Sequence, residues 1–219
     1  MFGMFYWNWN LEMIDSLREL QYLKYVESKI RISINSEKLG NLRELWIFGK
    51  LGNKFQFDSI TKFKRLEQLV VKVRGKACLE SLQPLTDCAN LKDLRLYGKI
   101  EKLPEDIHNV LPNLECLSLK NSRLKNDPMP ILEKLHSLMI PNLGSKLYSG
   151  KNLFCSAHGF RQLEILKLDD KDELEDWQAE EGAMPRLRGL SIPKDSSLRI
   201  PERFRSIPPT ADQCDFERD

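Results

Sequence analysis

One short phrase, Leu-x-x-Leu-x-[Leu/Ile/Val], recurs along the 219-residue chain. Copies begin at Leu42, Leu66, Leu91, Leu114, Leu135, Leu163 and Leu187. Successive starts lie 24, 25, 23, 21, 28 and 24 residues apart. A fixed period in this range is the signature of a repeat array, in which each unit buries its apolar side against its neighbours. Such an array presents an extended surface, so binding is the first function to expect.

The period and the phrase together predict a leucine-rich-repeat horseshoe, which is an α/β repeat solenoid. Each phrase forms a strand of a concave parallel β-sheet, and the motif leucines point inward because strand side chains alternate. The returning segments carry apolar anchors such as Phe57 and Leu85, and prolines such as Pro84 and Pro128 favour an irregular or short-helical convex side. A further phrase at Leu20 brings the number of irregular units to about eight.

We expect residues 1–200 to form the repeat domain and residues 201–219 to form a C-terminal cap and tail. Residues 1–19 would be the N-terminal edge, with an aromatic run that a preceding repeat would cover and a helix-like stretch from Leu11 to Leu20. The longest unit contains the Gly- and Ser-rich segment 144–151, which we expect to protrude as a loop.

The asparagine that follows the strand in regular arrays is almost missing from this chain. Its position, three residues after the last motif residue, holds Lys50, Arg74, Lys99, Ser122, Leu143, Lys171 and Asp195. Each turn must therefore find other partners for its backbone polar groups.

Composition favours a reducing compartment. The five cysteines form no Cys-x-x-Cys pair, and their odd number does not fit a disulfide framework. No apolar run reaches the roughly 18 residues that a membrane span requires. We therefore expect a chain of the cytoplasm or nucleus, with no membrane span.

The sequence offers no set of residues for catalysis. The histidines His108, His136 and His158 are far apart in the sequence, and neither a Gly-x-Ser-x-Gly elbow nor a phosphate-binding loop occurs. No metal-ligand spacing is present. We therefore expect no enzyme, cofactor, metal or small-molecule substrate, and we read the histidines as ordinary surface or packing residues.

Two charged runs have competing interpretations. The acidic run 169–181 has three possible interpretations: a calcium site, a patch for a basic partner, or a solvated turn anchored by Leu174 and Trp177. The run does not match the calcium-loop pattern, and we favour the turn because charge runs are usually solvated. The basic run 62–76 has only Phe63 beside it as an aromatic, and the net charge is only +2, so we expect no nucleic-acid partner.

The concave face is the predicted site. Strand alternation places its outward side chains between the motif leucines, and exposed aromatics beside Arg are typical of protein-interface hot spots. The alternative is that an adjoining repeat or loop covers the aromatics. The candidate partner-binding residues are Trp46, Phe48, Lys72, Arg95, Tyr97, Lys120, Met139 and Lys167.

Three segments carry a resemblance to a known family. Residues 174–187 read Leu-Glu-Asp-Trp-Gln-Ala-Glu-Glu-Gly-Ala-Met-Pro-Arg-Leu, and this phrase resembles the C-terminal repeats of plant coiled-coil, nucleotide-binding, leucine-rich-repeat disease resistance proteins. Residues 121–135, and residues 148–151 followed by 155–160, are similar to that family as well. The sequence contains no counterpart of the family's coiled coil or nucleotide-binding module.

This resemblance implies that the partner is a protein: a pathogen effector, a guarded host protein or, in a full receptor, the receptor's own nucleotide-binding module. It implies a role in the defence response, without a nucleotide switch in this chain. The alternative is a generic intracellular repeat scaffold or adaptor. An adaptor for ubiquitin ligation would need an N-terminal helical segment for which the residues before Leu11 leave little room.

Overall fold

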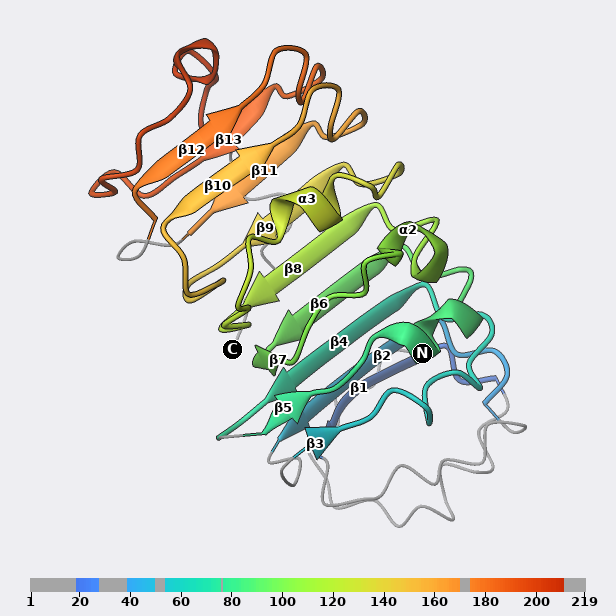
Figure 1. Cartoon of the computed structure of the whole chain (residues 1–219). Helices are drawn as coiled ribbons and strands as arrows, with labels where there is room; N and C mark the ends of the chain where they lie inside the picture. Colours follow the sequence, from blue (N-terminus) through green and yellow to red (C-terminus); the bar gives the residue numbers. More distant parts are fainter. Residues whose placement is uncertain (1–18, 28–38, 50–53, 76, 170–173, 211–219) are drawn as a thin grey trace.

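The computed structural model describes residues 19–27, 39–49, 54–75, 77–169 and 174–210 (Figure 1). Its main element is an eight-stranded parallel sheet whose strands follow one another in chain order. These strands are β1 (Tyr22–Glu27), β2 (Glu44–Gly49), β4 (Gln68–Val73), β6 (Asp93–Tyr97), β8 (Cys116–Lys120), β9 (Ile140–Leu143), β11 (Ile165–Leu168) and β13 (Gly189–Ser191). The predicted repeat solenoid with a parallel sheet is confirmed.

The returning segments form a second, irregular layer. Two small parallel sheets lie in it, made of β3 (Lys54–Phe55), β5 (Cys78–Leu79) and β7 (Lys99–Ile100), and of β10 (Asn152–Cys155) and β12 (Asp176–Ala179). Its helices are short: η1 (Gln83–Asp87), α2 (Ile107–Val110), α3 (Met129–Leu132) and η2 (Glu202–Phe204). Figure 1 shows β10 and β12, α2 and α3 in front of the main sheet. We call this the convex side and the opposite face of the sheet the concave face.

The core lies between these two layers. In β2 the side chains alternate between half-buried and buried, and the motif residues Leu45 and Ile47 are the buried ones. The convex anchors Phe57, Ile60 and Phe63 meet them from the other side and are fully buried. Because each fully buried apolar side chain contributes roughly 1.5–3 kcal/mol, the motif residues and the convex anchors together stabilise each unit.

The predicted strand register was wrong in one repeat. Cys116 pairs with Ile140 and Leu119 with Leu143, so Leu138, not Leu135, begins the phrase. Pro141 occupies the second leucine position, and the sequence phrase starting at Leu135 matched by coincidence because Leu135 is also buried. With Leu138 as the start, the spacings from Leu114 and to Leu163 become 24 and 25 residues, so the array is more regular than the sequence indicated.

The predicted protruding loop at residues 144–151 was wrong for the same reason. Once the register is corrected, this segment is an ordinary return of normal length. Leu147 and Tyr148 are buried in it, and Tyr148 forms a parallel bridge with Leu124 of the preceding repeat. The segment therefore belongs to the core layer.

Ser122, at the asparagine position, donates to the carbonyl of Leu147 at 3.0 Å, and side chains at a second position also bond the backbone of neighbouring turns. The residue before the first motif leucine donates to a backbone carbonyl of the preceding repeat in three successive turns: Asn90 to Lys64 (2.8 Å), Asn113 to Ala89 (2.9 Å) and Ser137 to Pro112 (3.1 Å). The requirement that each turn satisfy its backbone groups is thus met on the side where the strands begin.

Two carboxylates of the α3 repeat accept hydrogen bonds from the edge of β10 and the residue after it. Asp127 accepts from the backbone N–H of Met129 at 2.9 Å, which begins α3, and from that of Phe154 at 2.7 Å. Glu133 accepts from the N–H of Ser156 at 2.9 Å. Burial raises the pKa of Asp127, although its two backbone hydrogen bonds lower it. These carboxylates tie the β10–β12 sheet to the preceding repeat.

The segment 201–210 covers the last strand and the end of the core. The N–H of Leu190, on the outer edge of β13, donates to the carbonyl of Pro208 at 3.1 Å. Phe204 stacks on the buried ring of Trp177, with centroids 5.0 Å apart and an interplanar angle of 25°. The interpretation of Trp177 and Leu174 as apolar anchors of the acidic turn is confirmed by their burial.

Parts of the predicted domain plan lie outside the described residues. They are residues 1–18 of the N-terminal edge with most of the helix-like stretch, residues 28–38, 50–53 and 76 of the repeat domain, residues 170–173 of the acidic run, and the tail 211–219. The domain boundaries stay predictions.

The Phe204–Trp177 stack predicts a large stability effect. Replacing Phe204 by Ala uncovers Trp177 at the end of the core and should lower the free energy of unfolding by about 3 kcal/mol. Urea unfolding followed by Trp fluorescence measures it. Phe154→Ala is the matched control, because Phe154 is 39% exposed and its loss should cost less than about 0.5 kcal/mol. Equal effects of the two variants would contradict this assignment of the cap.

The two hydrogen bonds of Asp127 predict a second difference. Asp127→Ala leaves the N–H groups of Met129 and Phe154 without their acceptor and should destabilise the chain by about 1–2 kcal/mol. Asp106 directly precedes α2 but makes no side-chain cap hydrogen bond, so Asp106→Ala should be close to neutral. Thermal unfolding of both variants, compared with the parent chain, tests the pair; a neutral Asp127→Ala would refute it.

Candidate functional site

The concave face is organised in rows that run across the strands. The register aligns equivalent positions of successive repeats, about 4.8 Å apart. The middle row consists of Trp46, Val70, Arg95, Ser118, Asn142 and Lys167. The row nearer the strand ends consists of Phe48, Lys72, Tyr97 and Lys120. We call the latter the aromatic–lysine row.

Aromatic rings and ammonium groups alternate along the aromatic–lysine row. Lys72 Nζ lies 5.3 Å from the ring centroid of Phe48 and 5.7 Å from that of Tyr97. Lys120 Nζ, the last ammonium group of the row, lies 5.8 Å from the ring centroid of Tyr97. The guanidinium of Arg74 also lies over Phe48, at 4.4 Å. These cation–π contacts hold the long basic side chains in place.

A chain of hydrogen bonds crosses β2, β4 and β6 beside this row. Trp46 Nε1 donates to Gln68 Oε1 at 3.1 Å, and Gln68 Nε2 donates to Asp93 Oδ2 at 2.6 Å. Arg95 completes the chain with a two-pronged ion pair to Asp93, at 3.0 and 2.8 Å. Lys24 lies 4.5 Å from the ring of Trp46. The connected network fixes the orientation of the Trp46 ring.

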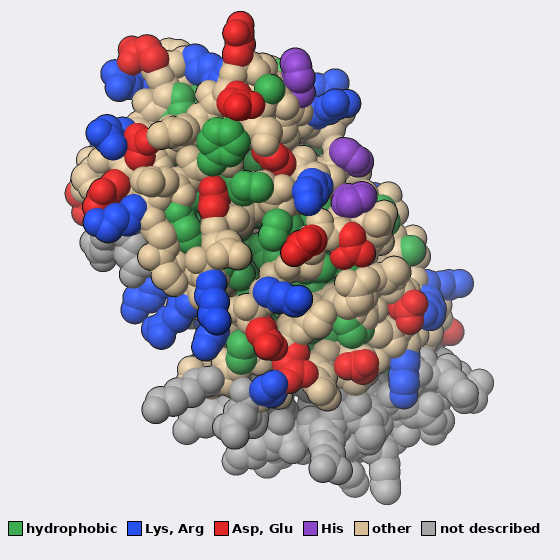
Figure 2. Space-filling view, in the orientation of Figure 1, with side chains coloured by type: hydrophobic (Ala, Val, Ile, Leu, Met, Phe, Trp, Pro, Cys, Tyr) green, Lys and Arg blue, Asp and Glu red, His purple; other side chains and the backbone are tan. Residues whose placement is uncertain are grey.

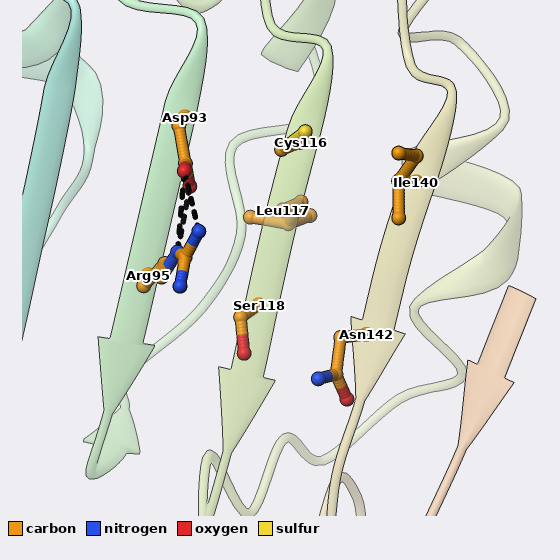
Figure 3. Close-up of a pocket in the computed structure, with 7 residues that line it drawn as sticks. All are labelled: Asp93, Arg95, Cys116, Leu117, Ser118, Ile140 and Asn142. Atoms are coloured by element: carbon orange, nitrogen blue, oxygen red, sulfur yellow. Dashed lines mark hydrogen bonds and ion pairs between the residues drawn. The ribbon is translucent and has the colours of Figure 1, made fainter. Parts of the chain in front are cut away.

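The middle row is more buried than the sequence indicated. Arg95 is only 8% exposed and Lys167 only 6%, although both were expected as exposed partner contacts. Ser118 and Asn142 lie between them in the row and are buried as well. Figure 3 shows Arg95 turned back to Asp93 of its own strand, with Ser118 and Asn142 on the next two strands.

The recess in Figure 3 is too small for an organic ligand. Asp93, Arg95, Cys116, Leu117, Ser118, Ile140 and Asn142 line it. Its volume is about 10 Å³, which is at the lower limit for a single water molecule. This part of the concave face therefore has no room for a bound ligand, and its polar side chains Arg95, Ser118 and Asn142 are buried.

Met139 does not belong to the concave rows. The corrected register places it one residue before β9, where its backbone N–H donates to Glu115, and its side chain is half-buried. Asn142 takes the concave position that the sequence phrase had assigned to Met139. Gln68 and Asp93 were not among the predicted site residues, although the alternation that selected Trp46 and Arg95 also gives them.

The histidines lie along the edge where the strands begin (Figure 2). The rings of His108 and His136 are 6.3 Å apart and tilted by 53°. Within the described residues, no group of three His, Cys, Asp or Glu side chains could hold a metal ion. None of the helices in the described residues combines the length and the apolar character that crossing a bilayer requires.

Two buried thiols are poor nucleophiles. Burial raises the pKa of Cys88 to about 11 and that of Cys155 to about 12. The indole N–H of Trp177 donates to the Cys155 sulfur at 3.4 Å, which opposes this rise in part. Both side chains are therefore protonated at neutral pH and act as core residues.

Sequence comparison agrees with this architecture. The profile of the family described as "Leucine-rich repeat region" matches residues 6–202. Similar proteins include a probable disease resistance protein of Arabidopsis thaliana, which is 34% identical over 87% of this chain and 25% of its own length. A probable disease resistance RPP8-like protein of the same plant is 42% identical over 89% of this chain and 25% of its own length.

Solved structures show the same fold. A leucine-rich-repeat protein of Leptospira interrogans superimposes with a TM-score of 0.60 and 20% identity, over 85% of this chain and 51% of its own. An internalin of Listeria monocytogenes gives a TM-score of 0.52 and 15% identity, over 90% and 62% of the two chains. At such identities the likeness concerns the fold alone.

A parallel-sheet solenoid with a patterned concave face is the architecture of a leucine-rich-repeat protein, and the chain belongs to that family. Within it, the chain is a repeat domain of the type found in plant disease resistance proteins. It spans about a quarter of the length of the relatives described above.

The raised thiol pKa values predict selective labelling. At pH 8 an aromatic disulfide reagent should leave Cys88 and Cys155 unmodified in the folded chain, because both thiols are protonated and buried, and should modify both in denaturant. Peptide mass spectrometry after alkylation identifies the sites. Cys78 is half-buried and serves as the internal reference. Labelling of Cys155 in the folded chain as fast as Cys78 would show that the core around it is open.

Proposed function

We propose that this chain is the recognition domain of a plant disease resistance protein and binds a pathogen effector or a guarded host protein in the defence response. The similarity to disease resistance proteins supports the defence role, and the leucine-rich-repeat architecture supports protein binding. In a receptor that also carries a nucleotide-binding module, that module is a further partner. The proposed compartment is the cytoplasm or nucleus, which the free thiols of Cys78, Cys88 and Cys155 support.

One observation carries the proposed binding face: the aromatic–lysine row and the Trp46 network lie side by side on the concave face of β2, β4, β6 and β8. Their aromatic and basic side chains are of the types that dominate binding energy at protein interfaces. The cation–π contacts and hydrogen bonds already order these side chains, so a partner binds them at a lower entropic cost.

The predicted partner contacts therefore fall into two groups. Trp46, Phe48 and Tyr97 are half-buried, Lys72 is exposed and Lys120 is half-buried, so a partner can reach them. Arg95 and Lys167 support the surface from the buried middle row. Met139 lies at the edge where the strands begin, outside the proposed face.

Removing both rings of the aromatic–lysine row tests this proposal. Phe48→Ala/Tyr97→Ala should reduce capture of the recognised protein from infected plant tissue by about ten-fold or more, because hot-spot side chains each contribute about 1–2 kcal/mol or more. Affinity purification with quantitative mass spectrometry measures the loss. The variant is first shown to be folded by circular dichroism.

Phe154→Ala is the matched control, since it removes an exposed ring from β10 on the convex side and should retain every partner. Equal capture by both variants would refute the concave face. If the captured proteins include no pathogen protein, and no host protein that a pathogen protein binds, the result would favour the alternative function, a generic repeat scaffold.

A further inference from the structure

The two edges of the main sheet carry their charges in different ways. Along the edge where the strands begin, basic and acidic side chains of neighbouring repeats pair: Arg43 with Glu67, Lys92 with Glu115 at 3.4 Å, and Arg188 with Glu164 at 2.7 Å. That edge neutralises itself. Figure 2 shows Lys and Arg side chains gathered at the opposite edge, where the strands end.

Five basic residues form a strip along that opposite edge, over the ends of β4, β8 and β9. We call it the basic strip: Lys72, Arg74, Lys120, Arg123 and Lys146. Its members follow the solenoid, since the N–H of Arg123 donates to the carbonyl of Lys146 at 2.8 Å. Lys72, Arg74, Arg123 and Lys146 are exposed, and among the described residues none of these four has an acidic side chain within ion-pair distance.

The backbone of the strip is strained at two of these residues. Arg123 and Lys146 have φ angles of 48° and 55°, in the left-handed region that glycine or asparagine adopts at lower cost. Glycine would adopt these backbone conformations at lower cost, and the exposed cationic side chains of Arg123 and Lys146 do not contribute to the core. Backbone strain of this kind concentrates at functional sites.

We propose that the basic strip binds an extended acidic segment of a partner protein, with carboxylates against its ammonium and guanidinium groups. This inference rests on the proposed function, because it names the chemistry of one partner of the same face. Like charges on neighbouring repeats repel one another, and an anionic chain laid across the repeats relieves that repulsion. The adjacent rings of Phe48 and Tyr97 hold Lys72 toward the partner.

The same geometry disfavours other polyanions. A single-stranded nucleic acid needs open aromatic faces for base stacking, whereas Lys72 and Arg74 cover the ring of Phe48, and Lys72 and Lys120 that of Tyr97. A bilayer is flat on this scale and cannot follow the concave side of the sheet, on which Lys72 and Lys120 lie. An extended peptide can enter that face and present one carboxylate on every second residue.

The test uses a fluorescein-labelled peptide, (Glu-Gly)₅, and its neutral counterpart (Gln-Gly)₅, in anisotropy titrations of the full chain at about 0.15 M salt, where screening limits non-specific attraction. The acidic peptide should bind at least about ten-fold more tightly than the neutral one. Lys72→Glu/Arg123→Glu should weaken that binding by about ten-fold or more. Lys62→Glu/Lys102→Glu changes the net charge equally, at exposed residues outside the strip, and should weaken it by less than about two-fold.

Two further variants distinguish binding at an ordered site from non-specific electrostatic attraction. One preserves the net charge and the other relieves backbone strain. Tyr97→Leu keeps the net charge but removes the ring beside Lys72 and Lys120, and should weaken peptide binding by about three-fold. Arg123→Gly/Lys146→Gly should weaken it as well, while the midpoint of thermal unfolding stays equal or rises. This combination keeps the test independent of misfolding.

Equal effects of the strip and control variants would overturn the proposal, as would tighter binding of a poly-uridine decamer or of phosphatidylserine vesicles than of (Glu-Gly)₅. Those outcomes would leave the proposed function intact if Phe48→Ala/Tyr97→Ala still loses its captured protein. Conversely, peptide binding at the strip without any such captured protein would refute the proposed function and retain the strip as an anionic-peptide site.

Discussion

The burial of motif leucines against the convex returns is the interaction on which the rest of this structure depends. Each strand places its leucines on one face, and no repeat can cover them alone; the neighbouring repeats and the returns, through residues such as Phe57 and Phe63, complete the core. This forces the strands into parallel register at a nearly constant spacing. The register then aligns equivalent outward positions in rows, so a surface such as the aromatic–lysine row is a consequence of core packing.

The irregularity of the array is resolved locally, turn by turn. Where the usual asparagine is missing, Asn90, Asn113 and Ser137 satisfy carbonyls on the side where the strands begin. Asp127 and Glu133 satisfy N–H groups of β10 and the residue after it on the convex side. Each device joins a repeat to its neighbour, so the same hydrogen bonds that satisfy the backbone also hold the solenoid together.

Charge is distributed in two different ways on the same scaffold. Ion pairs between repeats at the starting edge are exposed, and such pairs contribute little stability, but they cancel the local field. At the ending edge the basic strip retains its field next to ordered aromatic rings. The concave face therefore lies between one rim with paired charges and one cationic rim, and the proposed acidic partner would be oriented by this difference.

The sequence by itself determined the repeat, the parallel sheet, the buried anchors and the rows of the concave face, because a two-residue strand alternation and a 24-residue period are local patterns. It misplaced the strand β9, since Leu135 begins a complete phrase whereas the phrase from Leu138 has Pro141 at its second leucine position, and only pairing with β8 identifies the true register. Tertiary structure alone decided that Arg95 and Lys167 are buried, and that Lys72 lies between two rings. Burial and cation–π contact depend on side chains from neighbouring repeats, and no single repeat's sequence contains these contacts.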